Sequence, residues 1–210
     1  MNSYFSKFNK FPNNKLIRDM RSYAEKEKVP IIQDEGLTFL LFLIKTKKVR
    51  NILEIGTAIG YSAINMAMQS LDINIDTIER NEEMYNQAIR NIKKAKMTER
   101  INVHFKDALE VDINEFNRKY DLIFIDAAKA QYIKFFTLYE PLLSDDGVIF
   151  TDNLLFHGLV NNSERIESKN LRNLVTKIEN YNEWLANNEK YDTSFFSIGD
   201  GIAVSVKKNG

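Results

Sequence analysis

The stretch NILEIGTAIG, residues 51–60, joins an apolar run to a glycine-rich turn. Residues 51–55 are typical of a buried β-strand, and the pattern that follows predicts a helix from about Tyr61. A glycine-rich turn such as the one at Gly56 lets the backbone approach a ligand closely. The stretch therefore predicts a strand, a ligand-binding turn and a helix in succession.

The alternation of strand and helix continues along the chain. Further strands are predicted at INIDTI (73–78), INVHF (101–105), DLIFI (121–125) and GVIFT (147–151). Helices are predicted from about Glu82, shortly after residue 105, from about Gln131 and over about Ser168–Asn187. Strands that alternate with helices form right-handed crossovers, so the pattern predicts a mostly parallel sheet with helices on both faces, an α/β, Rossmann-like architecture.

The two ends of the chain follow other patterns. TSFFSI (193–198) and IAVSV (202–206), separated by Gly199-Asp200-Gly201, predict a C-terminal hairpin with an antiparallel strand at one edge of the sheet. Residues 1–45 predict N-terminal helices that break near residues 29–32 and that we expect to cover the site.

Composition excludes several classes of protein. The chain has no cysteine and two histidines, His104 and His157, so disulfides, thiolate metal sites and a cysteine nucleophile are excluded and a bound metal must use oxygen ligands. Its net charge is zero, so the whole molecule exerts no long-range attraction on nucleic acid. It has neither an apolar run long enough for a membrane span nor the apolar region of a signal peptide. We expect residues 1–210 to form a single cytoplasmic domain with no membrane partner.

Acidic and small residues follow three successive predicted strands. Glu54 stands where the dinucleotide fingerprint G-x-G-x-x-G has its first glycine, and an acid there repels a pyrophosphate but can hold a cationic amino group. Glu79 ends the second strand and can accept hydrogen bonds from both hydroxyls of a ribose. Asp107 and Ala108 follow the third strand. With the turn at Gly56, these residues predict a site for a ligand with an amino acid head, a ribose and a base, which is S-adenosylmethionine.

Two carboxylates and an amide follow the fourth and fifth predicted strands. Asp126 ends DLIFI, and Asp152 and Asn153 follow GVIFT. In the usual sheet order these strands are neighbours about 4.8 Å apart, so the three side chains can share one small cation such as Mg²⁺. The alternative for Asp152 and Asn153 is a helix cap or an Asx turn, which is common after strands.

Lys129 follows Asp126 by one turn and predicts base chemistry. At this position it can reach a substrate hydroxyl bound to the metal and take its proton, after which the oxyanion attacks the sulfonium methyl in line. The sequence thus predicts methyl transfer to oxygen with Asp126 and Lys129 as catalytic residues. The alternative is an exposed lysine that merely pairs with Asp126. Lys134 is a rival base, but its place further along the helix takes it away from the metal.

Basic and aromatic residues are interleaved near the N-terminus. Asp19 is the only acid within residues 1–21, and the cations there are Lys7, Lys10, Lys15, Arg18 and Arg21. The interleaved aromatic residues are Tyr4, Phe5, Phe8 and Phe11. Such a segment suits a single-stranded RNA loop, because phosphates need cations and unstacked bases need flat faces. The alternative is an amphipathic helix whose aromatic side chains pack on the body of the protein or on a partner subunit.

Several stretches together resemble the metal-dependent O-methyltransferases of the catechol and caffeoyl-CoA type. These stretches are LEIGTAIGYSAI, TIERN, DAL, FIDAAKAQYIKFF and VIFTDNLLFHGLV, and the resemblance extends from about Arg18 to the closing IGDGIAVS. Within that group the chain looks most like the bacterial tRNA 5-hydroxyuridine methyltransferases, which make 5-methoxyuridine at the anticodon wobble position.

The resemblance implies a seven-stranded class I methyltransferase fold, usually a homodimer, and a catalytic base at the matching Lys129. It implies Mg²⁺ or another divalent cation at Asp126, Asp152 and Asn153. The implied cofactor contacts are Ile32, Ser62, Glu79, Asp107, Ala108 and Asp126. Ile32 stands where relatives often carry methionine, a departure that concerns one packing contact.

More than one substrate satisfies the predicted site. 5-Hydroxyuridine offers an enol hydroxyl beside a carbonyl oxygen, which a metal can chelate much as it chelates catechol. The stretch DNLLFHGLV and the basic aromatic N-terminus favour a tRNA anticodon loop as partner, and zero net charge opposes it. A small-molecule O-methyltransferase for catechol-like or caffeoyl-CoA-like phenols is the alternative, and a non-catalytic RNA-binding protein on the same scaffold is a further one. His157 either lines the substrate entrance or is a surface-loop histidine.

Overall fold

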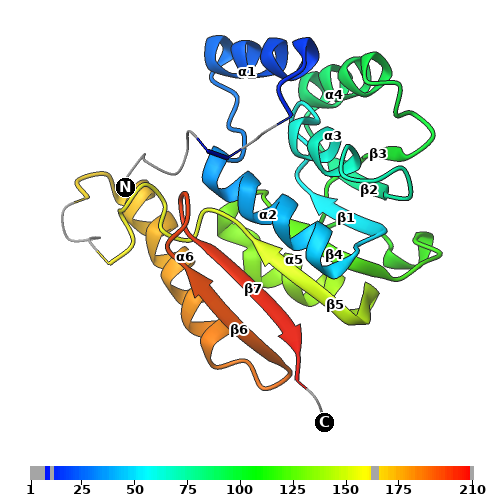
Figure 1. The fold of residues 1–210 in the computed structure, drawn as a ribbon. Helices are drawn as coiled ribbons and strands as arrows, with labels where there is room; N and C mark the ends of the chain where they lie inside the picture. The colour runs from blue at the N-terminus through cyan, green and yellow to red at the C-terminus, as the bar shows by residue number, and fades with distance from the viewer. Residues whose placement is uncertain (1–7, 10–11, 162–165, 209–210) are drawn as a thin grey trace.

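The computed structural model describes residues 8–9, 12–161 and 166–208, and Figure 1 shows a sheet between two layers of helices. The strands of this sheet are β1 Asn51–Ile55, β2 Asn74–Glu79, β3 Ile101–Phe105, β4 Tyr120–Ile125, β5 Leu143–Thr151, β6 Tyr191–Phe196 and β7 Ile202–Lys207. Their order is β3-β2-β1-β4-β5-β7-β6. β1 to β5 pair in parallel, whereas β7 is antiparallel to both β5 and β6. The predicted seven-stranded, mostly parallel sheet with a C-terminal hairpin is confirmed.

Helices cover both faces of the sheet. They are α1 Lys15–Glu27, α2 Asp34–Lys47, α3 Tyr61–Ala67, α4 Glu82–Lys94, α5 Tyr132–Tyr139 and α6 Lys169–Ala186. Short 3₁₀ helices stand at Ile113–Glu115 (η1), Lys129–Gln131 (η2) and Glu140–Leu142 (η3). α1 to α4 lie on one face, and α5 and α6 lie on the other (Figure 1). None of the helices in the described part of the chain is long and apolar enough to cross a membrane.

Side chains of the central strands alternate between two hydrophobic cores. Ile52, Phe124 and Phe150 belong to the core beneath α1 to α4. Their strand neighbours Leu53 and Ile123 belong to the core beneath α5 and α6. A buried strand presents successive side chains to opposite faces, so continuous apolar runs such as DLIFI are what a sheet covered on both faces requires.

The observed elements differ from the predicted ones in several places. β5 begins at Leu143, ahead of the predicted Gly147, because its first residues continue the ladder with β4. The edge strand is β6, and the antiparallel strand β7 lies inside it, against β5. α5 begins at Tyr132 because the η2 turn precedes it.

Among the described residues of the N-terminal region, helix α1 begins at Lys15. The predicted break is confirmed, because α1 ends with Lys28 in a left-handed conformation and α2 starts at Asp34. The described residues 8–9 and 12–14 are not helical, so the expected terminal helix does not include them. The basic and aromatic residues at positions 4, 5, 7, 10 and 11 lie outside the described residues.

The strand order brings three turns into a row at the centre of the sheet. β1 is the point where the order reverses, with β2 on one side and β4 on the other, and ligands bind at such a switch point beyond the carboxyl ends of the strands. Backbone bonds continue the ladder past the strands: Asp126 N donates to the Ile55 carbonyl (3.0 Å), and Asp152 N donates to the Ile125 carbonyl (3.2 Å). Asp126 and Asp152 are therefore held side by side, one strand apart.

Gly56 allows the first of these turns to approach the second. Its φ is +103°, and a Cβ at this position would lie 2.2 Å from the carbonyl oxygen of Asp126. No side chain can occupy that space without moving the backbone.

We expect Gly56→Ala to destabilise the fold by about 3 kcal/mol or more, because it adds a backbone clash to an unfavourable φ. The matched control is Gly158→Ala, where φ is +74° but a Cβ would meet nothing within 4 Å. The control should cost only about 1 kcal/mol. Urea unfolding of both variants measures the difference, and equal losses would contradict the close approach at Gly56.

Candidate active site

A cavity of about 710 Å³ opens beyond the carboxyl ends of the central strands. Its walls come from the α1–α2 connection, from the turns after β1, β2, β3, β4 and β5, and from the start of α3. The residues predicted from the sequence that line it are Ile32, Gly56, Ser62, Glu79, Asp107, Ala108, Asp126, Lys129, Asp152 and Asn153. One cavity thus brings together the predicted cofactor residues, the predicted metal ligands and the predicted base.

Glu79 is held by two backbone amides at the end of β2. Ala58 N donates to its Oε2 (2.8 Å), and Asn81 N donates to its Oε1 (2.8 Å). Asn81 in turn caps α4, because its side chain accepts from Met84 N. Each carboxylate oxygen keeps a free lone pair, so Glu79 can still accept from the two hydroxyls of a ribose.

Asp107 is fixed in a similar way after β3. Its Oδ1 accepts from Leu109 N (2.9 Å), and its Oδ2 accepts from Arg80 Nη1 (3.1 Å). The bond from Leu109 and the charge of Arg80 lower the pKa of Asp107. Ala108 is anchored by Tyr139, whose hydroxyl donates to the Ala108 carbonyl (2.7 Å). Arg80 was missed by the sequence reasoning, although it directly follows the predicted Glu79.

Glu54 lies beneath the cavity wall rather than on it. Its side chain is 0% exposed, and it is absent from the cavity lining. Ser62 Oγ donates to its Oε1, and Thr77 Oγ1 donates to its Oε2 (2.5 Å). The structure therefore does not bring Glu54 to a bound ammonium directly, because Ser62 stands between the carboxyl and the cavity. Burial raises the pKa of Glu54 to about 8.

Asp126, Asp152 and Asn153 meet at the other end of the cavity. Asn153 Nδ2 lies 3.1 Å from Asp126 Oδ1 and 3.2 Å from Asp152 Oδ2, so the amide bridges the two carboxylates. Asn153 has a φ of +68°, a conformation that asparagine tolerates better than most residues. Burial raises the pKa of Asp126. Burial and then the charge of Asp126 raise the pKa of Asp152 to about 7.

The donor set of this group fits a hard cation. Two buried carboxylates that face each other repel, and a divalent ion between them removes the repulsion. A half turn of the Asn153 amide would present its oxygen where its nitrogen now lies. Within the described residues no three acidic, histidine or cysteine side chains form a metal cluster, so the third protein ligand of an ion bound here would be this amide.

Lys129 lies on η2 and lines the same end of the cavity. Its side chain is half-buried, and no ion pair joins it to Asp126 in the part of the chain that the structure describes. Its Nζ lies 6.0 Å from the centroid of the Phe156 ring, within reach of a cation–π interaction. Lys134 is exposed and does not line the cavity. The geometry therefore separates the two lysines as the sequence predicted.

The loop that follows Asp152 and Asn153 is fixed by the turn between β6 and β7. Leu154 N donates to the Gly201 carbonyl (3.0 Å), and Leu155 N donates to the Asp200 carbonyl (2.7 Å). Phe156 and His157 then line the cavity. The sequence pointed to His157 but missed Phe156 and Asp200, since no local pattern shows that the hairpin turn packs on this loop.

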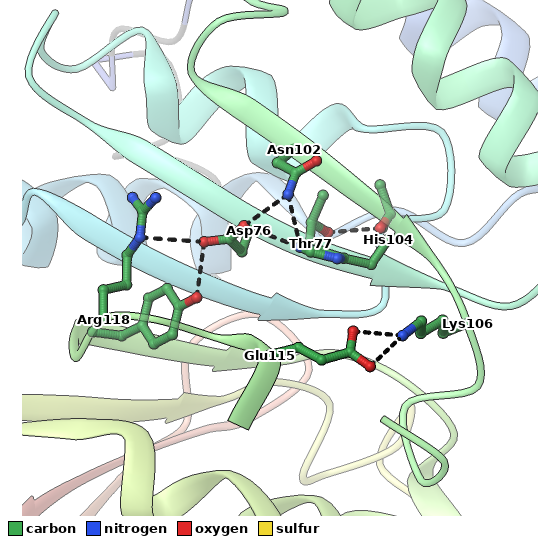
Figure 2. Close-up of polar contacts among 9 residues, drawn as sticks. Asp76, Thr77, Asn102, His104, Lys106, Glu115 and Arg118 are labelled. Carbon is green, nitrogen blue, oxygen red and sulfur yellow. Dashed lines mark hydrogen bonds and ion pairs between the residues drawn. The ribbon is translucent and has the colours of Figure 1, made fainter. Parts of the chain in front are cut away.

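The second histidine belongs to a separate polar cluster on β2 and β3, shown in Figure 2. Asp76 accepts from Tyr120 Oη (2.8 Å) and from Asn102 Nδ2 (3.1 Å), and His104 Nε2 lies 3.0 Å from the same carboxylate. Burial opposes ionisation of Asp76, but these bonds and the nearby Arg118 outweigh it, so its pKa is lowered. None of these residues lines the cavity.

The strand order, the hairpin and the cavity at the switch point define a class I methyltransferase fold. The chain belongs to the O-methyltransferase family, which it matches over residues 9–208.

Individual relatives agree with this family. A provisionally assigned caffeoyl-CoA O-methyltransferase from Staphylococcus aureus is 44% identical, with a TM-score of 0.89 and 93% of each chain covered. An O-methyltransferase from Bacillus cereus, solved in complex with S-adenosylhomocysteine, is 26% identical, with a TM-score of 0.82 and coverage of 99% of this chain and 96% of that one. A flavonoid 3',5'-methyltransferase from Vitis vinifera is 29% identical over 89% of this chain and 81% of its own.

The buried Glu54 makes stability depend on pH. Its pKa is raised from 4.5 to about 8, so between these values the folded chain keeps a proton that the unfolded chain releases. The contribution to stability is fully present below about pH 4.5 and is lost as pH rises through about 8. Glu54→Gln keeps the shape of the neutral side chain but cannot ionise. Between pH 6 and 8 the free energy of unfolding should fall by about 2 kcal/mol more in the wild type than in this variant. Urea denaturation measures it, and equal pH dependence would show that Glu54 is ionised when folded.

Proposed function

We propose that this protein is an S-adenosylmethionine- and Mg²⁺-dependent O-methyltransferase that converts 5-hydroxyuridine at the tRNA wobble position to 5-methoxyuridine. The observation that carries the chemistry is the single cavity with a nucleoside-binding end at Glu79 and Asp107 and an oxygen-donor end at Asp126, Asp152 and Asn153. The family supplies the reaction class, and S-adenosylhomocysteine in the Bacillus cereus relative supports the cofactor.

The chain's own residues hold the cofactor in a defined direction. Glu79 accepts from the ribose hydroxyls, and Asp107 and Ala108 border the base. Ser62 reaches the amino acid head. Glu54 behind it accepts a hydrogen bond from the Ser62 hydroxyl, which leaves the Ser62 lone pairs free to face the ligand's ammonium. A cofactor bound in this way would direct its methyl group toward the end of the cavity lined by Asp126, Asp152 and Asn153.

The oxygen donors and Lys129 prepare the attacking hydroxyl. A bound sulfonium supplies the methyl group, and a bound Mg²⁺ lowers the pKa of a chelated hydroxyl. Lys129, on the same side as the metal ligands, receives the hydroxyl proton. The η2 turn holds Lys129 close to this point, and its Nζ lies 6.0 Å from the centroid of the Phe156 ring. With both reactants bound in one site, the deprotonated oxygen would form a bond to the methyl carbon as the bond from that carbon to sulfur breaks, and S-adenosylhomocysteine would leave.

The choice of substrate rests on the sequence. The stretch DNLLFHGLV and the basic aromatic N-terminus, part of which lies outside the described residues, support RNA. A hydroxyl beside a carbonyl, as in 5-hydroxyuracil, suits chelation between Asp126, Asp152 and Asn153. The homodimer and the coverage of the site by residues 1–45 stay predictions, although the α1–α2 connection does line the cavity.

A second candidate is methylation of a small phenol. The flavonoid 3',5'-methyltransferase of grape and the provisionally assigned caffeoyl-CoA enzyme of Staphylococcus aureus favour it. Their substrates, by name, carry hydroxyls on aromatic rings, and the same oxygen donors would bind them. A non-catalytic RNA-binding protein is disfavoured, because the buried carboxylates, the amide and Lys129 are all present in one cavity.

Nucleoside analysis distinguishes these functions. In tRNA from a strain that lacks this protein, 5-methoxyuridine should disappear and 5-hydroxyuridine should accumulate, as measured by mass spectrometry. In vitro, the purified protein with Mg²⁺ should methylate an anticodon stem-loop that contains 5-hydroxyuridine. Unchanged nucleosides in the deletion strain, together with turnover of catechol or caffeoyl-CoA, would replace the RNA function by the small-phenol one.

The role of Lys129 is tested by a matched pair of variants. Lys129→Ala should lower kcat by about 100-fold or more, the usual contribution of a general base, while cofactor affinity measured by calorimetry stays unchanged. Lys134→Ala, at an exposed position outside the cavity, should retain full activity. A fully active Lys129→Ala would remove the base role, and equal loss in both variants would point to a general effect of surface charge.

A further inference from the structure

His157 lies in the loop after Asp152 and Asn153, and a buried carboxylate lies next to it. It lines the cavity, although 67% of its side chain is exposed to solvent. The adjacent Phe156 contacts Lys129, so this part of the loop borders the place where the reacting hydroxyl is held. An exposed loop histidine alone would have no functional meaning, but this one is bound to a buried carboxylate.

That carboxylate is Asp200, in the turn between β6 and β7. The Asp200 side chain is 5% exposed, and its Oδ1 accepts from the backbone N of His157. Its Oδ2 lies 3.4 Å from His157 Nδ1 and has no hydrogen-bond partner within the described residues. A buried carboxylate oxygen without another partner costs free energy. Since Oδ2 faces the imidazole, the favoured tautomer of His157 is the one that carries its proton on Nδ1. The remaining ring nitrogen, Nε2, then carries a free lone pair.

The backbone holds the ring in place. Phe156, His157 and Gly158 all have left-handed φ values, of 44°, 57° and 74°. The two residues before them are bonded to the hairpin turn, as described above. A Cβ on Gly201 would lie 2.6 Å from the side chain of Leu155, so turn and loop are in close contact. His157 is thus fixed by its backbone, and its Nδ1 lies 3.4 Å from Asp200 Oδ2.

Asp200 also lies near the metal ligands. Its charge raises the pKa of Asp152, after burial and Asp126, and acts on the buried Tyr132, which donates to the Asp152 carbonyl (2.9 Å). Asp200 is also close to the oxygen donors in the chain trace, because the carbonyls of Gly201 and Asp200 accept from the backbone N of Leu154 and Leu155, the residues directly after Asn153. A group on the substrate ring beside the chelating oxygens would face the pair of Asp200 and His157.

We propose that His157, positioned by Asp200, recognises the substrate, and that its Nε2 accepts a hydrogen bond from the ring N–H next to the chelating carbonyl. This inference rests on the proposed function, in which the ring is 5-hydroxyuracil. Uracil carries a proton on N3, beside the C4 carbonyl, whereas neutral cytosine has a lone pair there. An acceptor at this point favours hydroxyuridine and repels hydroxycytidine, since two acceptors would face each other.

The test compares two anticodon stem-loops, identical except for 5-hydroxyuridine or 5-hydroxycytidine at the target position, with the full-length protein and Mg²⁺. The variant is His157→Asn, because asparagine tolerates the left-handed backbone but is too short to replace Nε2. We expect KM for the hydroxyuridine RNA to rise about tenfold, with kcat within about twofold, and the preference for hydroxyuridine to fall by about the same factor.

Further variants separate recognition from folding. His157→Gln, which reaches as far and carries an acceptor oxygen, should retain part of the preference, and Asp200→Asn should reduce it. His104→Asn, which changes the histidine of the separate polar cluster, should change neither constant.

Each negative outcome has a distinct meaning. Wild-type methylation of hydroxyuridine RNA together with an unchanged KM and preference in His157→Asn would overturn this role and leave the proposed function intact. A wild-type protein that methylates neither RNA would overturn the proposed substrate and this role with it.

Discussion

The parallel ladder between β1, β4 and β5 is the constraint on which the site depends. Its backbone bonds run on past the strands, from Asp126 to Ile55 and from Asp152 to Ile125, so the strand ends form one continuous row. Gly56 permits the turn after β1 to contact the Asp126 carbonyl. The end of the cavity at Glu79 and Asp107 and the end at Asp126 and Asp152 therefore have a common wall made of backbone, which has little freedom to shift. Reactants held against such a wall need little reorganisation before methyl transfer.

Buried acids at this row weaken the fold in the absence of a cation. Asp126 and Asp152 are close together, and burial raises the pKa of each. The Asn153 amide partly compensates by donating to both. A carboxylate pair that costs folding energy when alone, and gains energy from a divalent ion, couples ion binding to stability. The same reasoning does not apply to Glu54, because Ser62 and Thr77 already satisfy its oxygens.

The parts of the site that follow directly from strand ends could be predicted from the sequence. Apolar runs located the central strands, and in a parallel sheet their carboxyl ends share one edge, so Glu79, Asp107, Asp126 and Asp152 were expected together. The burial of Glu54 beneath the cavity wall could not be predicted from the sequence. Alternation along a strand determines which face of the sheet a side chain lies on, but not how far it lies from the cavity. Arg80, Phe156 and Asp200 were missed because their roles arise from packing between segments that are distant in the sequence.

The turn at residues 199–201 gives the C-terminal hairpin more than an edge-sealing role. A Cβ on Gly199 would lie 3.3 Å from the backbone N of Gly36 at the start of α2, and Gly201 packs on Leu155. Three segments therefore pack against one another here: the hairpin turn, the loop at Leu155 and the start of α2. A change of shape in one of them requires a change in the others. An insertion in the hairpin turn would displace the substrate loop and the first turn of α2 together, while the nucleoside end, built from β2 and β3, stays as it is. In this chain, a change in the hairpin turn can therefore alter the loop at Leu155 without altering the turns after β2 and β3.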